Sequence, residues 1–377
     1  MHIALDGSDL ATKKFDGTSV YVREVLPLLA SELSKRGHRI TVFSHTPFEQ
    51  GIFGSEIEIC ITKGRRFWTQ TVLSRALFKL RPDLLFLPIQ TVPLYRPANL
   101  KVVATIHDLD FIEYPQMFDF KSLFLLRWFT RVVARNATRL VAVSNTTKDC
   151  IMKRYKRKGE DISVVYHGYE KKRFRLPVSE SEKSEAINNV QKKYNIPSDV
   201  ILFVGAFQPR KNIGTIISAF ELLKKTGKSQ HLILVTGNAW KSGGIISRIN
   251  ESPFRDCIHV LKNVPDEDLT GLYWNAKVFV LSSFAEGFGL PLLEAMACGI
   301  PAVVSNVSAL AEIGKQGAVL CDPKDPKDFC STIDKIVSNE EEFQKRKNAG
   351  LQRASEFSWE RSAQETADAI EKSFDKP

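Results

Sequence analysis

Short runs of Val, Ile and Leu alternate with amphipathic stretches along most of the chain, and this alternation limits the folds it can adopt. A run such as "DVILFVGA" (199–206) is too uniformly apolar for a strand with one face in water, and it is typical of a strand covered on both sides. Such strands occur in parallel sheets, in which a helix follows each strand and crosses back. The pattern therefore predicts an α/β protein with doubly wound parallel sheets.

The alternation forms two series with a polar stretch between them. The first series predicts strands at 2–6, 38–44, 83–88, 101–107, 138–144 and 162–167, and helices at 18–36, 68–80, 119–136 and 145–155. The second predicts strands at 199–206, 231–237, 257–264, 277–283 and 301–306, and helices at 212–226, 266–276, 288–298, 325–338 and 340–357. The polar stretch, 171–194, is either a loop or a short exposed helix after a linker near 168–176.

The two series predict two domains, because 377 residues exceed what one hydrophobic core usually holds. We expect the first domain over 1–170 and the second over 171–357, with a last helix in 358–377. Ligands of doubly wound sheets bind beyond the carboxyl ends of the strands. Two such domains that face each other would bring both sets of strand ends to one cleft.

Charge is unevenly divided between the two halves. Residues 1–168 contain 25 Lys and Arg against 16 Asp and Glu, whereas residues 169–377 contain 28 against 27. The first half therefore carries nearly all of the net charge of +10 and is expected to face something anionic. The chain has no run resembling a transmembrane helix and no start typical of a secretion signal, so we expect a cytoplasmic protein.

Metal binding is not indicated by the residues. The six cysteines are scattered without a C-x-x-C pair, and the seven histidines are equally dispersed. We expect reduced cysteines, no metal site and no cofactor. A "DLD" triplet (108–110) is the one Asp-x-Asp pattern to weigh, and we assign Asp108 to the support of its own loop.

The segment "SSFAEGFGLPLLEAMACGIP" (282–301) holds the sharpest pattern. Glu286 ends the loop after an expected strand, and Glu294 follows eight residues later on an expected helix. The glycines between them let backbone N–H groups approach a ligand, and a helix N-terminus favours an anion. Carboxylates repel phosphate but accept hydrogen bonds from the hydroxyls of a diol. The pattern fits a nucleotide sugar, although the same spacing also fits a plain strand–turn–helix with two unremarkable glutamates.

Two further motifs follow expected strands. In "FVGAFQPRKN" (203–212), Arg210 and Lys211 are placed to neutralise a diphosphate leaving group, or they are a solvated basic pair at a helix start. In "VVATIHDLDF" (102–111), His107 is either catalytic or structural. Gly17 opens an expected helix and is placed to touch a phosphate or an acceptor, although glycine is common at such positions.

Basic amphipathic stretches distinguish the first half. The tract from Cys60 to Pro82 has six Lys and Arg and no acid. Arginines recur every fourth residue in the next basic stretch, and they form one stripe if the helix continues far enough: Arg127, Arg131, Arg135 and Arg139. Such helices lie on anionic membrane surfaces, but a solvated helix face explains the pattern as well. Nucleic-acid binding uses similar charge but lacks a recognised motif here.

Together these residues resemble glycosyltransferase family 4. The resemblance spans the chain and rests on "TIHDLDFIEYPQMF", "LVAVSNTTKD", "VVYHGY", "VGAFQPRKN", "AEGFGLPLLEAMACGIPAV" and "FSWERSAQETADAIEK". It implies the GT-B fold, in which two Rossmann-like domains face a cleft and the C-terminal helix crosses back to the N-terminal domain. The site residues that it implies are His107, Glu286, Arg210 and Lys211 for catalysis, and Gly17, Gly205, Arg210, Lys211, Glu286, Gly287, Phe288, Gly289, Leu290 and Glu294 for the donor.

The family resemblance also assigns roles. Glu286 would contact the transferred sugar, Glu294 the ribose, Arg210 and Lys211 the diphosphate, and His107 the donor sugar near the acceptor. This chain departs from the pattern at Ala206, where relatives often have Arg, and at His167-Gly168, where they often have Asn-Gly. The first departure leaves the basic role to Arg210 and Lys211, and the second leaves the role of His167 open.

The resemblance implies a retaining, metal-independent reaction by front-face substitution, in which the departing diphosphate helps to deprotonate the incoming hydroxyl. We expect transfer of a hexose, mannose from GDP-mannose in the first instance, to a lipid-linked or polysaccharide acceptor of cell-surface glycan synthesis. A peripheral position at the inner face of the cytoplasmic membrane would fit. Two alternatives stay open: a soluble synthase acting on a glucan or small metabolite, and a non-catalytic nucleotide-sugar-binding or membrane-surface protein.

Overall fold

The chain forms two compact units in a computed structural model, each described by itself below. The structure describes residues 1–10, 17–49, 51–62, 64, 67–237 and 243–375. The first unit consists of residues 1–168 together with 358–377, and the second of residues 169–357. Lys63, Arg65 and Arg66 of the basic tract lie outside the described residues, as does Asp16 before the expected helix at 18–36.

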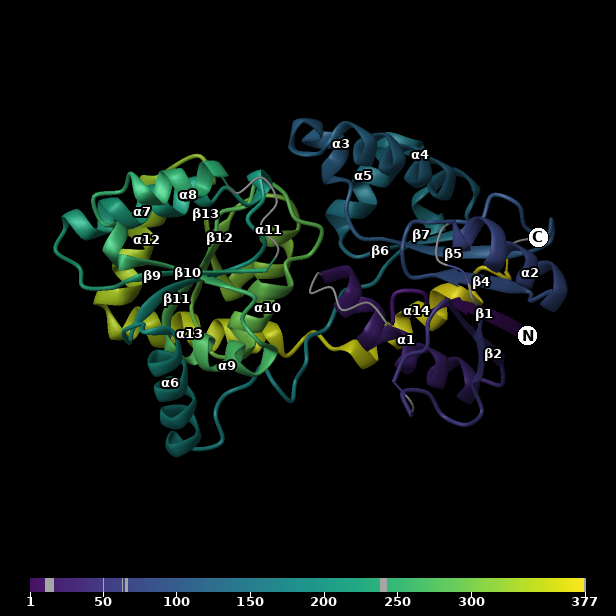
Figure 1. The fold of residues 1–377 in the computed structure, drawn as a ribbon, viewed down its shortest axis with the longest axis horizontal. Coiled ribbons are helices and arrows are strands. Elements are labelled where there is room, and N and C mark those ends of the chain that lie inside the picture. Colours follow the sequence, from purple (N-terminus) through teal and green to yellow (C-terminus); the bar gives the residue numbers. More distant parts are fainter. Residues whose placement is uncertain (11–16, 50, 63, 65–66, 238–242, 376–377) are drawn as a thin grey trace. The chain divides into compact units, whose positions relative to one another are not determined.

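A seven-stranded parallel sheet forms the centre of the first unit (Figure 1), with the strand order β3-β2-β1-β4-β5-β6-β7. Its strands are β1 (His2–Asp6), β2 (Arg39–Ser44), β3 (Glu58–Ile61), β4 (Leu84–Leu87), β5 (Lys101–Ile106), β6 (Arg139–Ala142) and β7 (Ile162–Val164). The strand order reverses between β1 and β4, as in a doubly wound sheet. The central strands are fully buried, which is why they read as continuous apolar runs.

Helices pack around this sheet, and three of them begin directly after a residue whose side chain caps the first turn. They are α1 (Gly17–Lys35), α2 (Ser74–Leu80), α3 (Asp110–Glu113), α4 (Phe120–Asn136), α5 (Asn145–Tyr155) and α14 (Trp359–Glu371), with a π-helical turn at Thr69–Leu73 and 3₁₀ turns at Pro115–Met117 and Gly159–Asp161. The side chains of Asp119, Ser144 and Ser358 accept N-cap hydrogen bonds at α4, α5 and α14. The predicted helix at 68–80 is thus a π-helical turn followed by α2.

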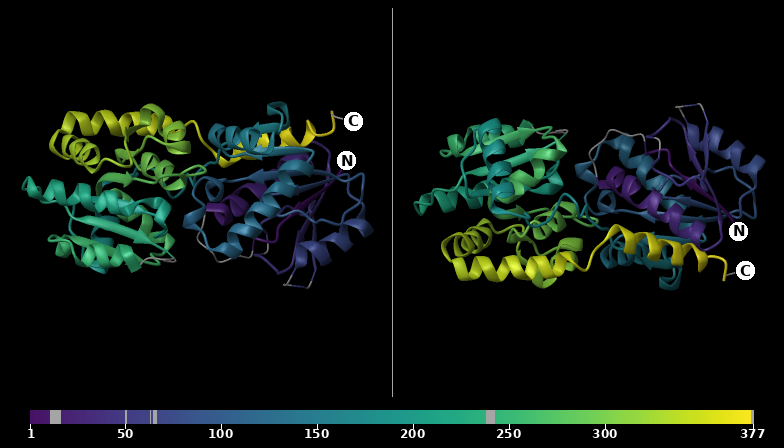
Figure 2. Two further views of the ribbon diagram at one scale, coloured as in Figure 1. Left: turned by 90° about the horizontal axis from the view of Figure 1, so that it is seen from above. Right: turned by 90° about the horizontal axis from the view of Figure 1, so that it is seen from below.

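The C-terminal helix α14 belongs to the first unit. It lies along α1 (Figures 1 and 2), and its residues Ala367 and Ile370 are fully buried. At its end, Arg36 donates to Asp368 at 2.7 Å and to Glu371 at 2.8 Å. The expected return of the last helix to the N-terminal domain is confirmed.

Two expectations for the first unit need correction. The arginine stripe does not reach Arg139, because α4 ends at Asn136 and Arg139 is the first residue of β6, where its guanidinium donates to the carbonyl of Glu160. Strand β3 was not predicted, because it is an exposed edge strand with none of its residues buried. It therefore lacks the apolar run by which the other strands are recognised.

Gly168 provides a test of how α14 is held. A Cβ at this position would lie 2.1 Å from the backbone nitrogen of Trp359 and 2.4 Å from the carbonyl carbon of Ser358. Because backbone cannot move aside as a flexible side chain can, we expect Gly168→Ala to lower the free energy of unfolding by about 1–3 kcal/mol. Chemical denaturation measures the change. The control Gly214→Ala, whose Cβ would meet nothing within 4 Å, should be neutral or slightly stabilising.

A six-stranded parallel sheet forms the second unit, with the order β10-β9-β8-β11-β12-β13. The strands are β8 (Val200–Val204), β9 (Leu232–Thr236), β10 (Ile258–Lys262), β11 (Ala276–Leu281), β12 (Ala302–Ser305) and β13 (Ala318–Cys321). The helices are α6 (Glu180–Tyr194), α7 (Ile213–Lys225), α8 (Gly243–Asn250), α9 (Asp266–Asn275), α10 (Leu290–Ala297), α11 (Ser308–Gly314), α12 (Pro326–Ser338) and α13 (Glu340–Ala354), with 3₁₀ turns at Pro209–Lys211, Arg255–Cys257 and Lys315–Gly317. Figure 2 shows helices on both faces of this sheet.

The polar stretch before the second sheet is a helix rather than a loop. In α6 the side chain of Ser179 accepts from the backbone of Glu182, and Val190 is the helix's one buried residue. Within the described residues, none of the helices combines the length and the apolar character that crossing a bilayer requires. With parallel, helix-covered sheets in both units, the predicted α/β fold class is confirmed.

Candidate functional site

The candidate site of the second unit lies at the carboxyl ends of β8 and β11. These strands are neighbours, and the strand order of the sheet reverses between them. In doubly wound sheets the crevice at such a reversal is where ligands bind. The segment after β8 carries Arg210 and Lys211, and the segment after β11 carries Glu286. The topology therefore brings Glu286 beside two adjacent cations that lie about 75 positions earlier in the sequence.

Glu286 is buried and held by three side chains. Its Oε1 accepts hydrogen bonds from Lys211 Nζ and, at 2.7 Å, from Ser283 Oγ. Its Oε2 accepts from Arg210 Nη1 at 3.0 Å. Because an ionised carboxylate offers about four acceptor positions, these contacts leave about one position, at Oε2, for a ligand hydroxyl.

The charges around Glu286 keep it ionised. Its burial alone would raise the pKa of the carboxyl, but the charges of Lys211 and Arg210 outweigh burial and lower this pKa to about 2. Lys211 is itself buried, with 8% of its surface exposed. The site thus holds one carboxylate and two cations, which together carry one net positive charge.

The turn that presents the two cations is fastened to the neighbouring strand end. Residues 209–211 form a 3₁₀ turn, and Asn212 follows in the left-handed region at φ 52°. Its Nδ2 donates to the carbonyls of Ser282 at 3.0 Å and of Pro323 at 2.7 Å, while the backbone N–H of Phe284 donates to the carbonyl of Arg210 at 2.8 Å. These contacts fix the direction in which the basic side chains leave the sheet.

The glycine-rich turn after Glu286 leads into α10. Gly289 has φ +97°, and a Cβ there would lie 2.7 Å from Leu310, so this position requires glycine. Helix α10 begins at Leu290 with Pro291 in its first turn, as the sequence predicts. Phe288 in this turn is buried, and its ring centroid lies 6.0 Å from that of Phe357. Gly287 lies within this turn, and Leu290 is the first residue of α10. Gly205, the other predicted glycine, directly follows β8.

Glu294 lies in a different environment from Glu286. It is on α10, half-buried, and its Oε2 accepts a hydrogen bond from the hydroxyl of Tyr273 at 2.8 Å. Desolvation by burial raises the pKa of this carboxyl to about 7, which the Tyr273 hydrogen bond only partly offsets. The two glutamates of this segment therefore differ in pKa: Glu286 is firmly ionised, and Glu294 titrates near neutral pH.

His107 lies in the first unit, just after β5. Its Nε2–H donates to the carbonyl of Pro88 at 2.8 Å, and its ring meets that of Tyr21 edge to face at 4.9 Å. His167 packs on the same Tyr21 ring at 4.8 Å and on Trp359 at 5.4 Å. Burial lowers the pKa of His167 well below its ordinary value, so this residue is neutral and serves to pack the loop that carries His107.

Gly17 and Asp108, which the sequence also singles out, lie in the first unit. Gly17 begins α1, as expected, and Tyr21 on the same helix donates to or accepts from Thr105 at 3.1 Å. Asp110 is buried in the first turn of α3, whereas Asp108 is half-buried in the loop before it. His107 and Gly17 belong to the first unit and the Arg210–Lys211–Glu286 group to the second.

Sequence reasoning missed three residues that orient the site: Ser283, Tyr273 and Tyr21. Ser282 and Ser283 end the apolar run "KVFVLSS", and a hydroxyl at the end of a buried strand is a usable signal. Tyr273 and Tyr21 gave no such signal, because a tyrosine in an amphipathic helix is ordinarily a core residue.

Two family models match the chain and together span most of it. Residues 15–173 match the model described as Glycosyltransferase Family 4, and residues 183–353 match Glycosyl transferases group 1. Among curated proteins, O-antigen chain mannosyltransferase B of Escherichia coli is 35% identical over 169 residues, which are 45% of this chain and 44% of that protein. O-antigen chain mannosyltransferase RfbU of Salmonella typhimurium is 31% identical over 246 residues, 65% of this chain and 62% of that protein. The matches thus span less than two thirds of these curated relatives.

Solved structures share the fold at low sequence identity. Sucrose-phosphate synthase from Thermosynechococcus elongatus is 20% identical, with a TM-score of 0.76 over the whole of both chains. Alr3699/HepE of Anabaena, solved in complex with UDP and glucose, is 17% identical, with a TM-score of 0.74 over 98% of this chain and 99% of the other. These likenesses bear on the fold of this chain.

Proposed function

The chain belongs to glycosyltransferase family 4, and on this premise we propose that it is a retaining, metal-independent glycosyltransferase. It transfers a hexose, mannose from GDP-mannose in the first instance, from the nucleotide sugar to a hydroxyl of a lipid-linked or polysaccharide acceptor in surface-glycan synthesis. The mannose assignment is supported by the O-antigen mannosyltransferases among its relatives. It would work in the cytoplasm, peripherally at the inner face of the membrane.

One observation carries this proposal: a buried carboxylate that is held by two cations at the reversal of the second sheet. The departing nucleoside diphosphate gains negative charge as the bond to the sugar breaks. Arg210 and Lys211 stabilise that charge, and preorganised cations in a site with little water lower the barrier more than they strengthen binding. They supply the positive charge for which other transferases use a divalent metal.

Glu286 has a second task besides orienting these cations. Its remaining acceptor position at Oε2 takes a hydroxyl of the transferred sugar, so that the anomeric carbon is held against the acceptor. Its three existing hydrogen bonds and its low pKa make Glu286 a poor nucleophile, because the lone pairs needed for attack are engaged. This supports front-face substitution, in which a diphosphate oxygen takes the acceptor proton.

A direct assay tests the proposal. The purified chain is incubated with GDP-mannose and a lipid-linked acceptor in the presence of a chelator, and release of GDP and the anomeric configuration of the product are measured. We expect turnover without metal and an α-linked product from the α-configured donor. The parallel assay with UDP-glucose separates the sugar assignment from the reaction class. Turnover of no nucleotide sugar, with nucleotide binding retained, would leave the non-catalytic binding protein as the function.

Glu294 makes donor binding depend on pH. Ionised, its carboxylate can accept hydrogen bonds from both hydroxyls of a ribose, whereas the protonated form loses much of that capacity. Because burial raises the pKa of Glu294 to about 7, we expect the apparent donor Kd to rise about tenfold per pH unit below 7. Titration calorimetry between mildly acidic and mildly alkaline pH measures this.

Two variants check the assignment to Glu294. Glu294→Gln should bind the donor weakly at every pH and show no such slope. Tyr273→Phe removes a hydrogen bond that stabilises the carboxylate, so it should move the midpoint to higher pH. A wild-type affinity that is flat across neutral pH would contradict the role of Glu294.

A further inference from the structure

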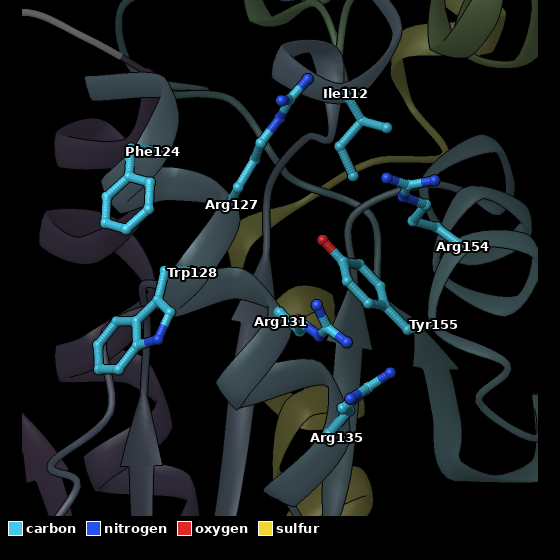
Figure 3. Close-up of a pocket in the computed structure, with 8 residues that line it drawn as sticks. All are labelled: Ile112, Phe124, Arg127, Trp128, Arg131, Arg135, Arg154 and Tyr155. Atoms are coloured by element: carbon cyan, nitrogen blue, oxygen red, sulfur yellow. The ribbon is translucent and has the colours of Figure 1, made fainter. Parts of the chain in front are cut away.

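A cavity of about 440 Å³ lies between α3, α4 and α5 in the first unit, and neither His107 nor Gly17 lines it. Figure 3 shows the side chains that line it: Ile112, Phe124, Arg127, Trp128, Arg131, Arg135, Arg154 and Tyr155. Four of the eight are arginines and none is acidic. Arg154 and Tyr155 come from α5, opposite the arginines of α4. We call this cavity the arginine pocket.

The four arginines are unusual in having no counter-charge. Among the residues that the structure describes, no carboxylate lies within 4.0 Å of any of their guanidinium groups, although the same unit contains many ion pairs. Arg127, Arg131 and Arg135 also repeat every fourth residue, a spacing at which like charges destabilise a helix by a few tenths of a kcal/mol per pair. Among the described residues no ion pair offsets the mutual repulsion within this cluster, and an anionic ligand would relieve it.

The pocket also has a hydrogen-bond donor at its centre. In Figure 3 the hydroxyl of Tyr155 points into the space bounded by Ile112, Arg127 and Arg131. Burial raises the pKa of this hydroxyl against the opposing charges of Arg154, Arg131 and Arg127, so Tyr155 stays protonated and can donate. Planar guanidinium groups bind phosphate through paired hydrogen bonds, and a volume of this size accommodates a diphosphate.

An exposed apolar face adjoins the pocket on α4. Phe120 is 83% exposed and Phe124 63%, and Leu125 and Trp128 are exposed as well. Phe124 and Trp128 also line the arginine pocket, so the apolar face and the arginines of α4 are continuous (Figure 3). A cluster of four large apolar side chains in water is costly unless a partner covers it, and its position beside cations is typical of a surface that meets lipid.

We propose that the arginine pocket binds the phosphate or diphosphate group of the lipid-linked acceptor, while the apolar face of α4 takes up the adjoining part of the lipid chain. This proposal rests on the proposed function, because it takes the ligand of the pocket to be the acceptor of the glycosyl transfer. Four guanidinium groups can donate hydrogen bonds to the several oxygens of a diphosphate, and the neighbouring apolar side chains match its lipid. The pocket thereby selects an acceptor that carries a phosphorylated lipid over a free sugar or glucan.

Vesicle binding tests the proposal without any donor. Neutral phosphatidylcholine vesicles containing farnesyl diphosphate are compared with vesicles of equal surface charge containing phosphatidylglycerol instead. The pocket variant carries Arg127→Gln, Arg131→Gln and Arg154→Gln. The charge-matched control carries Lys35→Gln, Lys158→Gln and Lys372→Gln, three exposed cations of the same unit outside the pocket.

We expect wild-type protein and the control to prefer the farnesyl diphosphate vesicles, and the pocket variant to bind them at least about 100-fold more weakly. Inorganic pyrophosphate should compete for the wild-type protein. Phe120→Ser with Leu125→Ser, two exposed residues of the apolar face that do not line the pocket, should weaken vesicle binding but leave the affinity for pyrophosphate unchanged. The proposal is overturned if wild-type protein binds both vesicle types equally, or if the control loses as much affinity as the pocket variant. A Phe120→Ser, Leu125→Ser variant without effect on vesicle binding would overturn the lipid part and leave a free phosphate as the ligand.

This readout is independent of the proposed enzymatic activity. Turnover of nucleotide sugar by the wild-type protein, assayed as nucleoside diphosphate release with the lipid-linked acceptor in detergent and no vesicles, tests the glycosyltransferase function alone. Absence of turnover together with selective diphosphate binding would overturn the enzyme and keep the pocket. Turnover with unselective vesicle binding would do the reverse.

Discussion

Glu286→Gln is expected to lower the rate of hexose transfer about 10²- to 10³-fold, with a smaller effect on donor binding. Glutamine has the shape of glutamate but loses the charge that holds Lys211 and Arg210 in place. The two cations then repel each other and leave the positions in which they meet the departing diphosphate. Steady-state kinetics with a saturating acceptor separates kcat from the donor KM.

Two matched variants separate charge from position at Glu286. Glu286→Asp keeps the charge but withdraws the carboxylate by one methylene, so we expect it to keep most of the stability and still lose transfer. Ser283→Ala removes the 2.7 Å hydrogen bond to Oε1 and keeps both cations paired, so its effect should be about tenfold. Equal activity of the Asp, Gln and wild-type proteins would rule out a role for Glu286 in transfer.

Glu286 also makes the stability of the protein depend on pH. Its pKa is lowered from 4.5 to about 2 in the folded state, so the folded protein binds this proton less readily than the unfolded chain does. The resulting stabilisation, about 3 kcal/mol, is fully present above pH 4.5 and is lost as the pH falls toward 2. In Glu286→Gln this part of the acid dependence should be absent, which denaturation at several acidic pH values can measure.

The fold could be predicted largely from the sequence, because buried parallel strands are continuous apolar runs. Strands β1 and β5 and helices α4 and α5 lie within one or two residues of the predicted bounds. Most of the elements that were missed lack this signal; β13, which was missed as well, has the apolar run AVLC, but the strand is only four residues long. Strand β3 is exposed, and α8 and α11, with eight and seven residues, are too short to show a helical period.

The site was predicted in part, and the limit has a physical cause. The apolar runs indicated that Glu286 follows one strand and that Arg210 and Lys211 follow another, and these two strands are neighbours in the second sheet. They did not indicate that Glu286 binds both cations, because a contact across 75 residues depends on the order of the strands. Nor did they show that the fourth arginine of the pocket is Arg154 on α5 rather than Arg139. Helix α4 ends at Asn136, so Arg139 does not continue its stripe.

Lys211→Met should produce the second large loss, about 10²- to 10³-fold in kcat, with the donor KM changed far less. Methionine keeps the length of the buried side chain but removes the charge. The substitution leaves Glu286 with Arg210 as its one remaining cationic partner, so the pKa of Glu286 should rise. Removing one partner of a buried ion pair costs about 3–5 kcal/mol of stability, and denaturation at neutral pH should show a loss of this order. Lys192→Met, the same change on the exposed face of α6, serves as the control.

The division between kcat and KM distinguishes the two roles that Lys211 can have. A cation that only holds the diphosphate of the bound donor binds ground state and transition state alike, so its loss raises KM and leaves kcat in place. A cation that meets charge as it develops on the leaving oxygen lowers the barrier itself, so its loss lowers kcat. The buried position of Lys211 beside Glu286 favours the second role, since little water is present to replace the missing charge. An unchanged kcat in Lys211→Met, with the fold retained, would assign the leaving-group role to Arg210 instead, and Arg210→Met should then carry the loss.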